Sequence, residues 1–413
     1  MAGYIIMDSV SDIKINGVDV VKIAQGLNTL WEKNVIEPFY FEDRSGAENT
    51  ITCTKTGDQE EWLSLEYSTD RQTWSTYDLT QTLTIPANGR VYLRGSNTSG
   101  FGYNATNYHT FTCSGNYALG GDLFSIMDGS LFAYPSRFGH KTFYQSTTLV
   151  DISQLDFGSK KILAVDFVQM FGYCTSLVSL PNMIGVSYAS TVDFSSHTSQ
   201  FMQMFQYDPI ANFPTFPNIN TIGKDGMYCM NQTLNASPNT SLEFVDLSNI
   251  TTLYYRGLYM AFRNASALEV VKIGISSWPD FVDSEASDYN ATGEWLYGVH
   301  STGVFCKNST LPVMRGDNYI PNNWSIADLN GKLYDPVITE SNGDITIAEG
   351  GGGSSSTIYY TTDGSDPDTT SNVYSQPFSV ASGTVIKAFA DYTPTGSNVP
   401  LITQSNITTY TAQ

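Results

Sequence analysis

The sequence has little charge, few basic residues and no long hydrophobic run. Only 15% of its 413 residues are charged, whereas a typical soluble domain has roughly 25%. The 20 Lys and Arg residues are outnumbered by 40 Asp and Glu residues, which gives a net charge of −20. Such a surface repels nucleic acid and anionic lipid, and no basic cluster or apolar run of ~18 residues offsets it. We therefore expect neither nucleic-acid binding nor membrane insertion.

Histidine and cysteine are also scarce, which argues against a metal site. No CxxC pair and no mixed Cys/His cluster occurs among the four histidines and five cysteines. Free buried thiols are the favoured state, and a disulfide between Cys53 and Cys113 is the alternative to test. No GxSxG motif or distinctive carboxylate pair is present either, so we assign no catalytic, cofactor-binding or metal-binding residue. The histidines are His109, His140, His197 and His300, and the cysteines are Cys53, Cys113, Cys174, Cys229 and Cys306.

The residues that supply polarity instead are Thr, Ser, Asn, Gly and Tyr. This composition favours strands and turns over surface helices, which normally use Glu, Lys and Arg. Hydrophobic residues make up 41% of the chain, which is enough to fold all of it. Its length exceeds that of a single ordinary core, so several domains are expected. The composition therefore predicts a mainly β, multidomain protein.

The first two predicted domains carry hairpin and sandwich signals. Residues 1–35 contain Asn16-Gly17 between alternating apolar residues, a pattern typical of a β-hairpin. Residues 36–118 have turn signals about every ten residues, as in a β-sandwich. One such turn is expected at Pro86–Gly89, and Trp74 is expected to enter the sandwich core.

Residues 119–334 contain a repeated unit in which a Phe precedes a Leu by six residues. Clear copies occur at Phe143, Phe171 and Phe262, and degenerate copies start at Met204 and Met230. The spacing of about 28 to 35 residues is typical of a solenoid of stacked units. Because each unit can bury its Phe and Leu only against its neighbours, we expect these phenylalanines in a shared core. The predicted solenoid consists of strands with some short helices.

Residues 335–413 are predicted to form a final β-sandwich. The Gly/Ser-rich segment EGGGGSSST is flanked closely by strand-like sequences, so we interpret it as a long hairpin loop rather than a flexible linker. Asp363, Asp366 and Asp368 cluster in a turn and could bind calcium. Their spacing does not match an EF-hand, and Asp-Gly and Asp-Pro are ordinary turn sequences. We favour the turn interpretation.

Two segments resemble known families. The segment DIKINGVDVVKIAQGLNTLWEK resembles a hairpin element of phage structural proteins, which implies an N-terminal anchor to a particle. The segment IYYTTDGSDPDTTSNVYSQPFSVASGTVIKAFA resembles the immunoglobulin-like C-terminal domain associated with chitobiases. In that family the domain is an accessory sandwich and not the catalytic part.

A third resemblance covers residues of about 36 to 330. The run MFGYCTSLVSLPNM resembles the BspA-like leucine-rich repeat family, whose arrays close with "W..GV..tG.F" and "IP..W" segments. The matching segments here begin at Trp295, Thr302 and Ile320, and the "YS.D...W" sandwich that often precedes the array matches from Tyr67. The middle units depart from the pattern because they lack its Cys and Leu.

These resemblances imply a bacteriophage virion structural protein without enzymatic activity, either a tail fibre or tail-associated protein or a capsid-decorating one. Its N-terminal region would contact other virion proteins, and its outer modules a host glycan or surface protein, with no cofactor. Exposed β-edges favour a homo-oligomer, and for a fibre we expect a trimer. The N-terminus lacks a secretory signal pattern, which fits a phage protein released by lysis. A bacterial cell-surface adhesin is the second hypothesis, and a glycoside hydrolase with accessory domains is the third.

Overall fold

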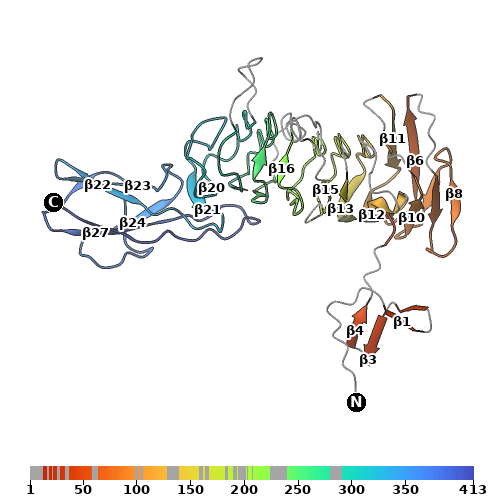
Figure 1. Cartoon of the computed structure of the whole chain (residues 1–413), viewed down its shortest axis with the longest axis horizontal. Coiled ribbons are helices and arrows are strands. Elements are labelled where there is room, and N and C mark those ends of the chain that lie inside the picture. Colours follow the sequence, from red (N-terminus) through yellow and green to blue (C-terminus); the bar gives the residue numbers. More distant parts are fainter. Residues whose placement is uncertain are drawn as a thin grey trace.

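A computed structural model describes most of the chain. The described residues are 37–57, 64–97, 101–102, 106–127, 139–157, 167–181, 185–186, 193, 201, 203–206, 208–223, 240–279 and 291–413, together with the backbone of 13–15, 18–20, 22–25, 28–32, 161–162 and 187–188. From the sandwich strands to the C-terminal strands these residues form one elongated body (Figure 1). No helix in this part of the chain is long and apolar enough to cross a membrane. The prediction of a mainly β, multidomain protein is confirmed.

The N-terminal segment forms two hairpins. Strands β1 (Ile13–Ile15) and β2 (Val18–Val20) pair antiparallel with Ile15 opposite Val18. Strands β3 (Lys22–Gln25) and β4 (Asn28–Glu32) form the second pair. The pairing of β1 with β2 confirms the predicted hairpin, whose turn residues Asn16 and Gly17 lie outside the described residues.

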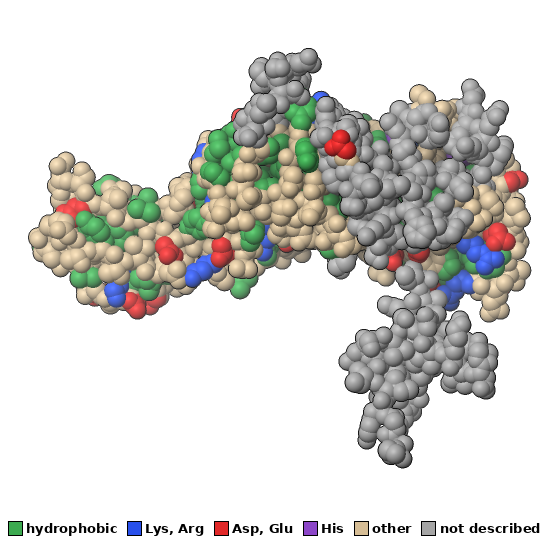
Figure 2. All heavy atoms as spheres, viewed as in Figure 1, with side chains coloured by type: hydrophobic (Ala, Val, Ile, Leu, Met, Phe, Trp, Pro, Cys, Tyr) green, Lys and Arg blue, Asp and Glu red, His purple; other side chains and the backbone are tan. Residues whose placement is uncertain are grey.

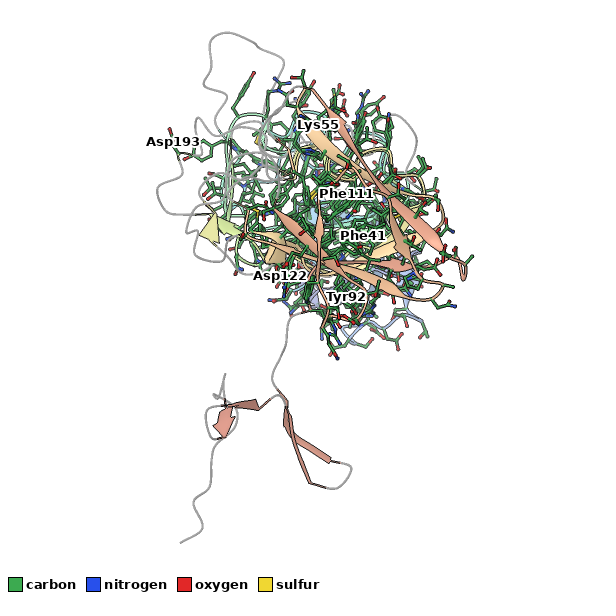
Figure 3. All side chains as sticks on the ribbon, turned by 90° about the vertical axis from the view of Figure 1, so that its right-hand side faces the viewer. Phe41, Lys55, Tyr92, Phe111, Asp122 and Asp193 are labelled. Atoms are coloured by element: carbon green, nitrogen blue, oxygen red, sulfur yellow. The ribbon has the colours of Figure 1, made fainter. Side chains whose placement is uncertain are left out.

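A β-sandwich follows. Its larger sheet has the strand order β13-β12-β5-β10-β7-β8 and its smaller sheet the order β11-β6-β9. Phe41 and Phe111 lie between the sheets with ring centroids 5.6 Å apart (Figure 3). The strands are β5 (Tyr40–Asp43), β6 (Asn49–Thr56), β7 (Leu65–Ser68), β8 (Ser75–Tyr77), β9 (Leu83–Ile85), β10 (Arg90–Gly95), β11 (Tyr108–Cys113) and β12 (Tyr117–Asp122).

The predicted turn is confirmed, but the predicted core tryptophan is not. The Gly89 amide donates to the Pro86 carbonyl across 2.8 Å. Trp74 is half-buried at the surface, where the Arg94 guanidinium lies 4.0 Å from its ring centroid. Tyr77 is 1% exposed and fills the core instead. The prediction for Trp74 was wrong because Tyr77 is the inward residue of the strand Ser75–Tyr77. Side chains alternate between the two faces, so Trp74, three positions before Tyr77, faces outward.

The sandwich continues into the solenoid without a break in its sheet. Strand β12 pairs antiparallel with β5 and parallel with β13 (Leu149–Asp156). A single apolar cluster includes Phe39 of the sandwich and Ile326 of the last solenoid strands. Between β12 and β13 lies the 3-10 helix η2 (Leu123–Ile126). It is the one helical element among the described residues, where the sequence led us to expect several.

Stacked turns replace the expected helices of the solenoid. The Phe143 amide donates to the Met170 carbonyl of the next unit, and the Phe171 amide donates to the Met204 carbonyl beyond it, both across 2.9 Å. The intervening Tyr144 amide instead donates to Lys141 in its own turn, across 3.1 Å. Alternate donors thus bond within and between units, which satisfies the backbone without an α-helix.

The repeated phenylalanines form the predicted core. Phe143 and Phe171 stack with centroids 5.5 Å apart and an interplanar angle of 6°. Phe171 and Phe205 repeat this arrangement at 5.7 Å and 5°. Phe143, Phe171 and Phe262 are each 0% exposed, which confirms their assignment to the core. The copy expected from Met230 begins outside the described residues, and only its last part, which includes Phe244–Leu247, is described. His197 and Cys229 lie outside the described residues.

Short parallel strands run along the other side of the solenoid. The most regular sheet has the order β17-β19-β20-β21, with every neighbouring pair parallel. The strands are β14 (Lys161–Ile162), β15 (Ser187–Tyr188), β16 (Thr221–Ile222), β17 (Phe244–Leu247), β18 (Thr252–Leu253), β19 (Val270–Ile273), β20 (Val304–Lys307) and β21 (Ser325–Asp328).

Residues 335–413, which we call the C-terminal module, form two small antiparallel sheets with the orders β22-β23-β26 and β25-β24-β27-β28. Strands β23 and β24 lie in different sheets, so the Gly/Ser-rich segment between them is a crossover and the hairpin-loop interpretation was wrong. The strands are β22 (Val337–Ser341), β23 (Asp344–Ala348), β24 (Thr357–Thr361), β25 (Asn372–Val373), β26 (Phe378–Ser379), β27 (Val385–Asp391) and β28 (Thr408–Thr411).

Candidate binding surface at the C-terminal joint

The C-terminal module meets the solenoid along the outward side of β19, β20 and β21. In a strand, successive side chains point to opposite faces, so Phe305 lies in the solenoid core while Val304 and Cys306 point outward. These outward side chains are nevertheless 0% exposed, because they belong to the same apolar cluster as Ile345 and Ile386 of the module. The joint is therefore a packed interface.

Glu269 connects the two sides of this interface. Its carboxylate accepts hydrogen bonds from the Tyr392 hydroxyl (3.0 Å), from the Thr395 amide and hydroxyl (3.1 Å each) and from the Gly396 amide. The carboxylate of Glu243 accepts a bond from the Asn398 amide across 2.7 Å. We call residues 392–398 the joint loop. Burial, followed by the neighbouring charge of Glu269, raises the pKa of Tyr392 above its ordinary value.

The Gly/Ser-rich crossover is held at a second point. The Arg315 guanidinium donates to the carbonyls of Trp324 (2.6 Å) and Gly351 (2.9 Å). The Glu349 carboxylate accepts from the Ser325 hydroxyl and the Ser356 amide, each across 2.6 Å. Burial raises the pKa of Glu349, although these hydrogen bonds and the Arg315 charge oppose the shift. The glycines allow the close backbone approach that Arg315 needs.

An open cavity of about 460 Å³ lies beside this joint, lined in part by Lys332, Tyr334, Asp335, Val337 and Asn406. The Lys332 ammonium donates to the Asn406 side-chain oxygen across 2.6 Å, and the Asn406 amide group donates to Asp335 across 3.1 Å. Tyr334 and the 51% exposed Val337 supply apolar surface. Alternating donors and acceptors next to a ring suit an uncharged, hydroxyl-rich ligand such as a carbohydrate.

The calcium candidate has another structural explanation. Asp363 accepts from the Ser365 amide (3.0 Å), and Asp368 accepts from the Thr370 amide (2.8 Å). Asp366 pairs with Lys387 across 2.7 Å. Hydrogen bonds from the Ser365 hydroxyl and amide lower the pKa of Asp363, and those from the Thr370 hydroxyl and amide lower the pKa of Asp368. No group of three His, Cys, Asp or Glu side chains suited to a metal ion occurs in the described part of the chain.

The cysteines and histidines do not form a site with one another in the described residues. Cys53 and Cys113 are free, so the proposed disulfide is not formed. In the antiparallel register Cys53 lies opposite Phe111 and Cys113 opposite Ile51, which makes the two cysteines diagonal neighbours rather than a direct pair. His109 is 4% exposed, and its pKa is lowered mainly by burial. His300 contacts the Thr302 carbonyl across 2.8 Å and so has a local role.

The surface at the joint carries charge of both signs, because Asp328, Lys332 and Asp335 line its cavity. Figure 2 shows one face on which uncharged side chains predominate over the solenoid and the module, with acidic and basic side chains interspersed among them. Residues 345–405 match the family described as Fn3 associated. This match supports an immunoglobulin-like sandwich in the C-terminal module and includes the joint loop. No curated protein and no solved structure gives a significant match to the chain.

The joint cavity was not predicted from the sequence. Lys332 and Asn406 are far apart along the chain and carry no recognisable motif. They meet because the Lys332 backbone bridges to Thr403, which brings the following Asn406 beside Asp335. The one feature of the sequence that points to this region is the Fn3-associated segment. It places the C-terminal module in the chain but does not indicate which residues the module contacts.

Proposed function

We propose that this chain is a non-enzymatic structural and display protein of a bacteriophage particle. The observation that carries the display role is the packed joint, which fixes the C-terminal module and its cavity at one end of a stiff solenoid. A rigid support lets a binding surface engage a partner without first losing the entropy of a flexible tether. The phage assignment is supported by the resemblance of the N-terminal hairpins to a particle anchor.

In this proposal the N-terminal hairpins attach the chain to other virion proteins. The sandwich and solenoid then hold the C-terminal module away from the particle, towards a glycan or protein of the host surface. The hydroxyl, amide and carboxylate groups around Tyr334 favour a glycan for the joint cavity. Such a contact needs no cofactor and no chemical step.

Mass spectrometry of purified phage particles tests the particle assignment. We expect the chain at a fixed copy ratio, and mild stripping into head and tail fractions assigns it to one of them. A chain lacking residues 1–35 is the matched control and is expected to be absent from particles. If the intact chain is absent from particles but present on bacterial cells, the adhesin hypothesis replaces this proposal. Release of reducing sugar from host polysaccharide would instead support the glycoside hydrolase.

A further inference from the structure

The outward face of the solenoid sheet changes from charged to uncharged side chains towards the C-terminal module. Along one row of paired residues the outward side chains are Asp246, Lys272, Cys306 and Ala327, in strand order. Asp246 and Lys272 are half-buried, whereas Cys306 and Ala327 are 0% exposed. The last strands thus lack the polar outer face that a solenoid needs in water.

Strand β21 is the last strand of this sheet, so one of its edges has no neighbouring strand of the solenoid. An unpaired edge exposes backbone donors and acceptors that can template association with another chain. Here the Tyr334 amide donates to the Ile326 carbonyl (2.9 Å), and the Asp328 amide donates to the Lys332 carbonyl (2.9 Å). The Leu333 amide in turn donates to the Thr403 carbonyl (3.1 Å). The edge of β21 is therefore covered by residues 332–334, and these are backed by the C-terminal module.

We propose that the C-terminal module is the end cap of the solenoid, and that the joint loop is the latch that holds the cap in place. The module covers both the apolar outward face of β19 to β21 and the open edge of β21. The latch is fastened to the solenoid by Glu269 and Glu243, whose carboxylates accept hydrogen bonds from residues 392–398. This role is independent of the particle assignment, because it concerns only how the chain completes its own fold.

Gly396 offers a way to open the latch without altering either core. A Cβ at this position would lie 2.7 Å from atoms of both the Glu243 and the Glu269 carboxylates. Gly396→Ala must therefore displace the two carboxylates, the joint loop or both, and either movement disturbs the hydrogen bonds that join them. Ser397→Ala is the matched control, because Ser397 is its exposed neighbour. Thr395→Ala is a milder second variant, which removes only the hydroxyl bond to Glu269.

The alkylation rates of two buried cysteines show whether the interface between the module and the solenoid has opened in the full-length chain. Cys306 lies beneath the cap, and Cys174 lies in the solenoid core. Burial raises the pKa of Cys306 to about 12, so its thiol reacts only when the interface opens. The experiment measures alkylation of each cysteine by iodoacetamide under native conditions, together with hydrogen exchange of β20 and β21.

For Gly396→Ala we expect Cys306 to react about tenfold faster or more, the effect of losing a buried hydrogen bond. Cys174 should be unchanged, and β20 and β21 should lose exchange protection. Ser397→Ala should match the parent chain.

Unchanged Cys306 reactivity in Gly396→Ala would contradict the proposal that the joint loop holds the module in place. If Cys306 reacts faster while β20 and β21 keep full exchange protection, the module is only tethered to the solenoid and does not stabilise its last strands. That result would contradict the proposed role as an end cap. If Gly396→Ala exposes both cysteines by global unfolding, Thr395→Ala decides by the same criteria.

Discussion

At the scale of single residues, several carboxylates organise turns rather than form a site. Asp43 accepts amide hydrogen bonds from Ser45 (2.9 Å), Gly46 (3.0 Å) and Asn88 (2.8 Å). It also accepts from the Asn49 side chain across 2.8 Å. Burial alone would raise the pKa of Asp43, but the hydrogen bonds outweigh it and lower the pKa to about 2. The carboxylate thus ties β5 to two loops of the sandwich.

The lowered pKa of Asp43 gives a pH-dependent stability. Its stabilising effect is fully present above the unfolded value, roughly pH 4, and is lost as pH falls towards about 2. We expect Asp43→Asn to lower the denaturant midpoint at neutral pH and to flatten its dependence on pH in this window. Asp317→Asn, at an exposed position, is the control. A parallel pH profile for parent and Asp43→Asn would contradict the prediction.

The second prediction at this scale concerns the reactivity of the free thiols of Cys53 and Cys113. Burial raises the pKa of Cys53 to about 12 and that of Cys113 further, so both resist alkylation in the folded chain. We expect full alkylation of Cys53 and Cys113 after denaturation without reductant, and little before it. The measurement is peptide mass spectrometry. Peptides that are alkylated only after reduction would show a disulfide and refute the assignment.

At the scale of the elements, the repeats depend on aromatic stacking between units. Phe171 touches Phe143 on one side and Phe205 on the other. Because Phe171 packs against a ring of each neighbouring unit, a cavity at Phe171 weakens two unit boundaries at once. The ring therefore contributes to the stability of the array and not of one unit alone.

We expect Phe171→Ala to destabilise the chain by about 3 to 5 kcal/mol, the usual cost of removing a buried aromatic ring. The free energy comes from equilibrium unfolding in urea, followed by circular dichroism. Val178→Ala, at a side chain that is 47% exposed, should change it by less than about 0.5 kcal/mol. Equal effects of the two substitutions would mean that the stacked core does not hold the array together.

The sequence predicted those elements whose signals are local or periodic. The Asn16-Gly17 hairpin and the Pro86–Gly89 turn follow from turn chemistry, and Phe143 and Phe171 follow from a fixed spacing. Trp74 was misplaced because Tyr77 takes the inward position, and Trp74, three positions earlier, falls on the opposite face. The path of the Gly/Ser-rich crossover and the Lys332–Asn406 contact depend on tertiary packing, which leaves no pattern in one segment.

At the scale of the whole molecule, the three parts are coupled through shared structure. Strand β12 belongs to the sandwich and pairs with the solenoid strand β13. At the other end, Val304 and Cys306 share an apolar cluster with the C-terminal module. Each boundary thus buries groups that either part alone would expose.

This coupling predicts a single cooperative unfolding transition for residues 37–413. We expect the calorimetric enthalpy to agree with the van't Hoff enthalpy within error. The latch variant Gly396→Ala should separate a transition of the module from the rest. Two resolved transitions in the parent chain would show that its parts fold independently.

The alternating bonds of the stacked turns have a consequence for length. Within the described array the turn amides of an internal unit bond to its neighbouring units, so gain or loss of one complete internal unit would preserve this pattern of bonds. Such a change would move the distal end by about 4.8 Å, the separation of neighbouring parallel strands. Gene duplication within the array could therefore adjust the reach of this protein in small, equal steps while both of its ends stay the same.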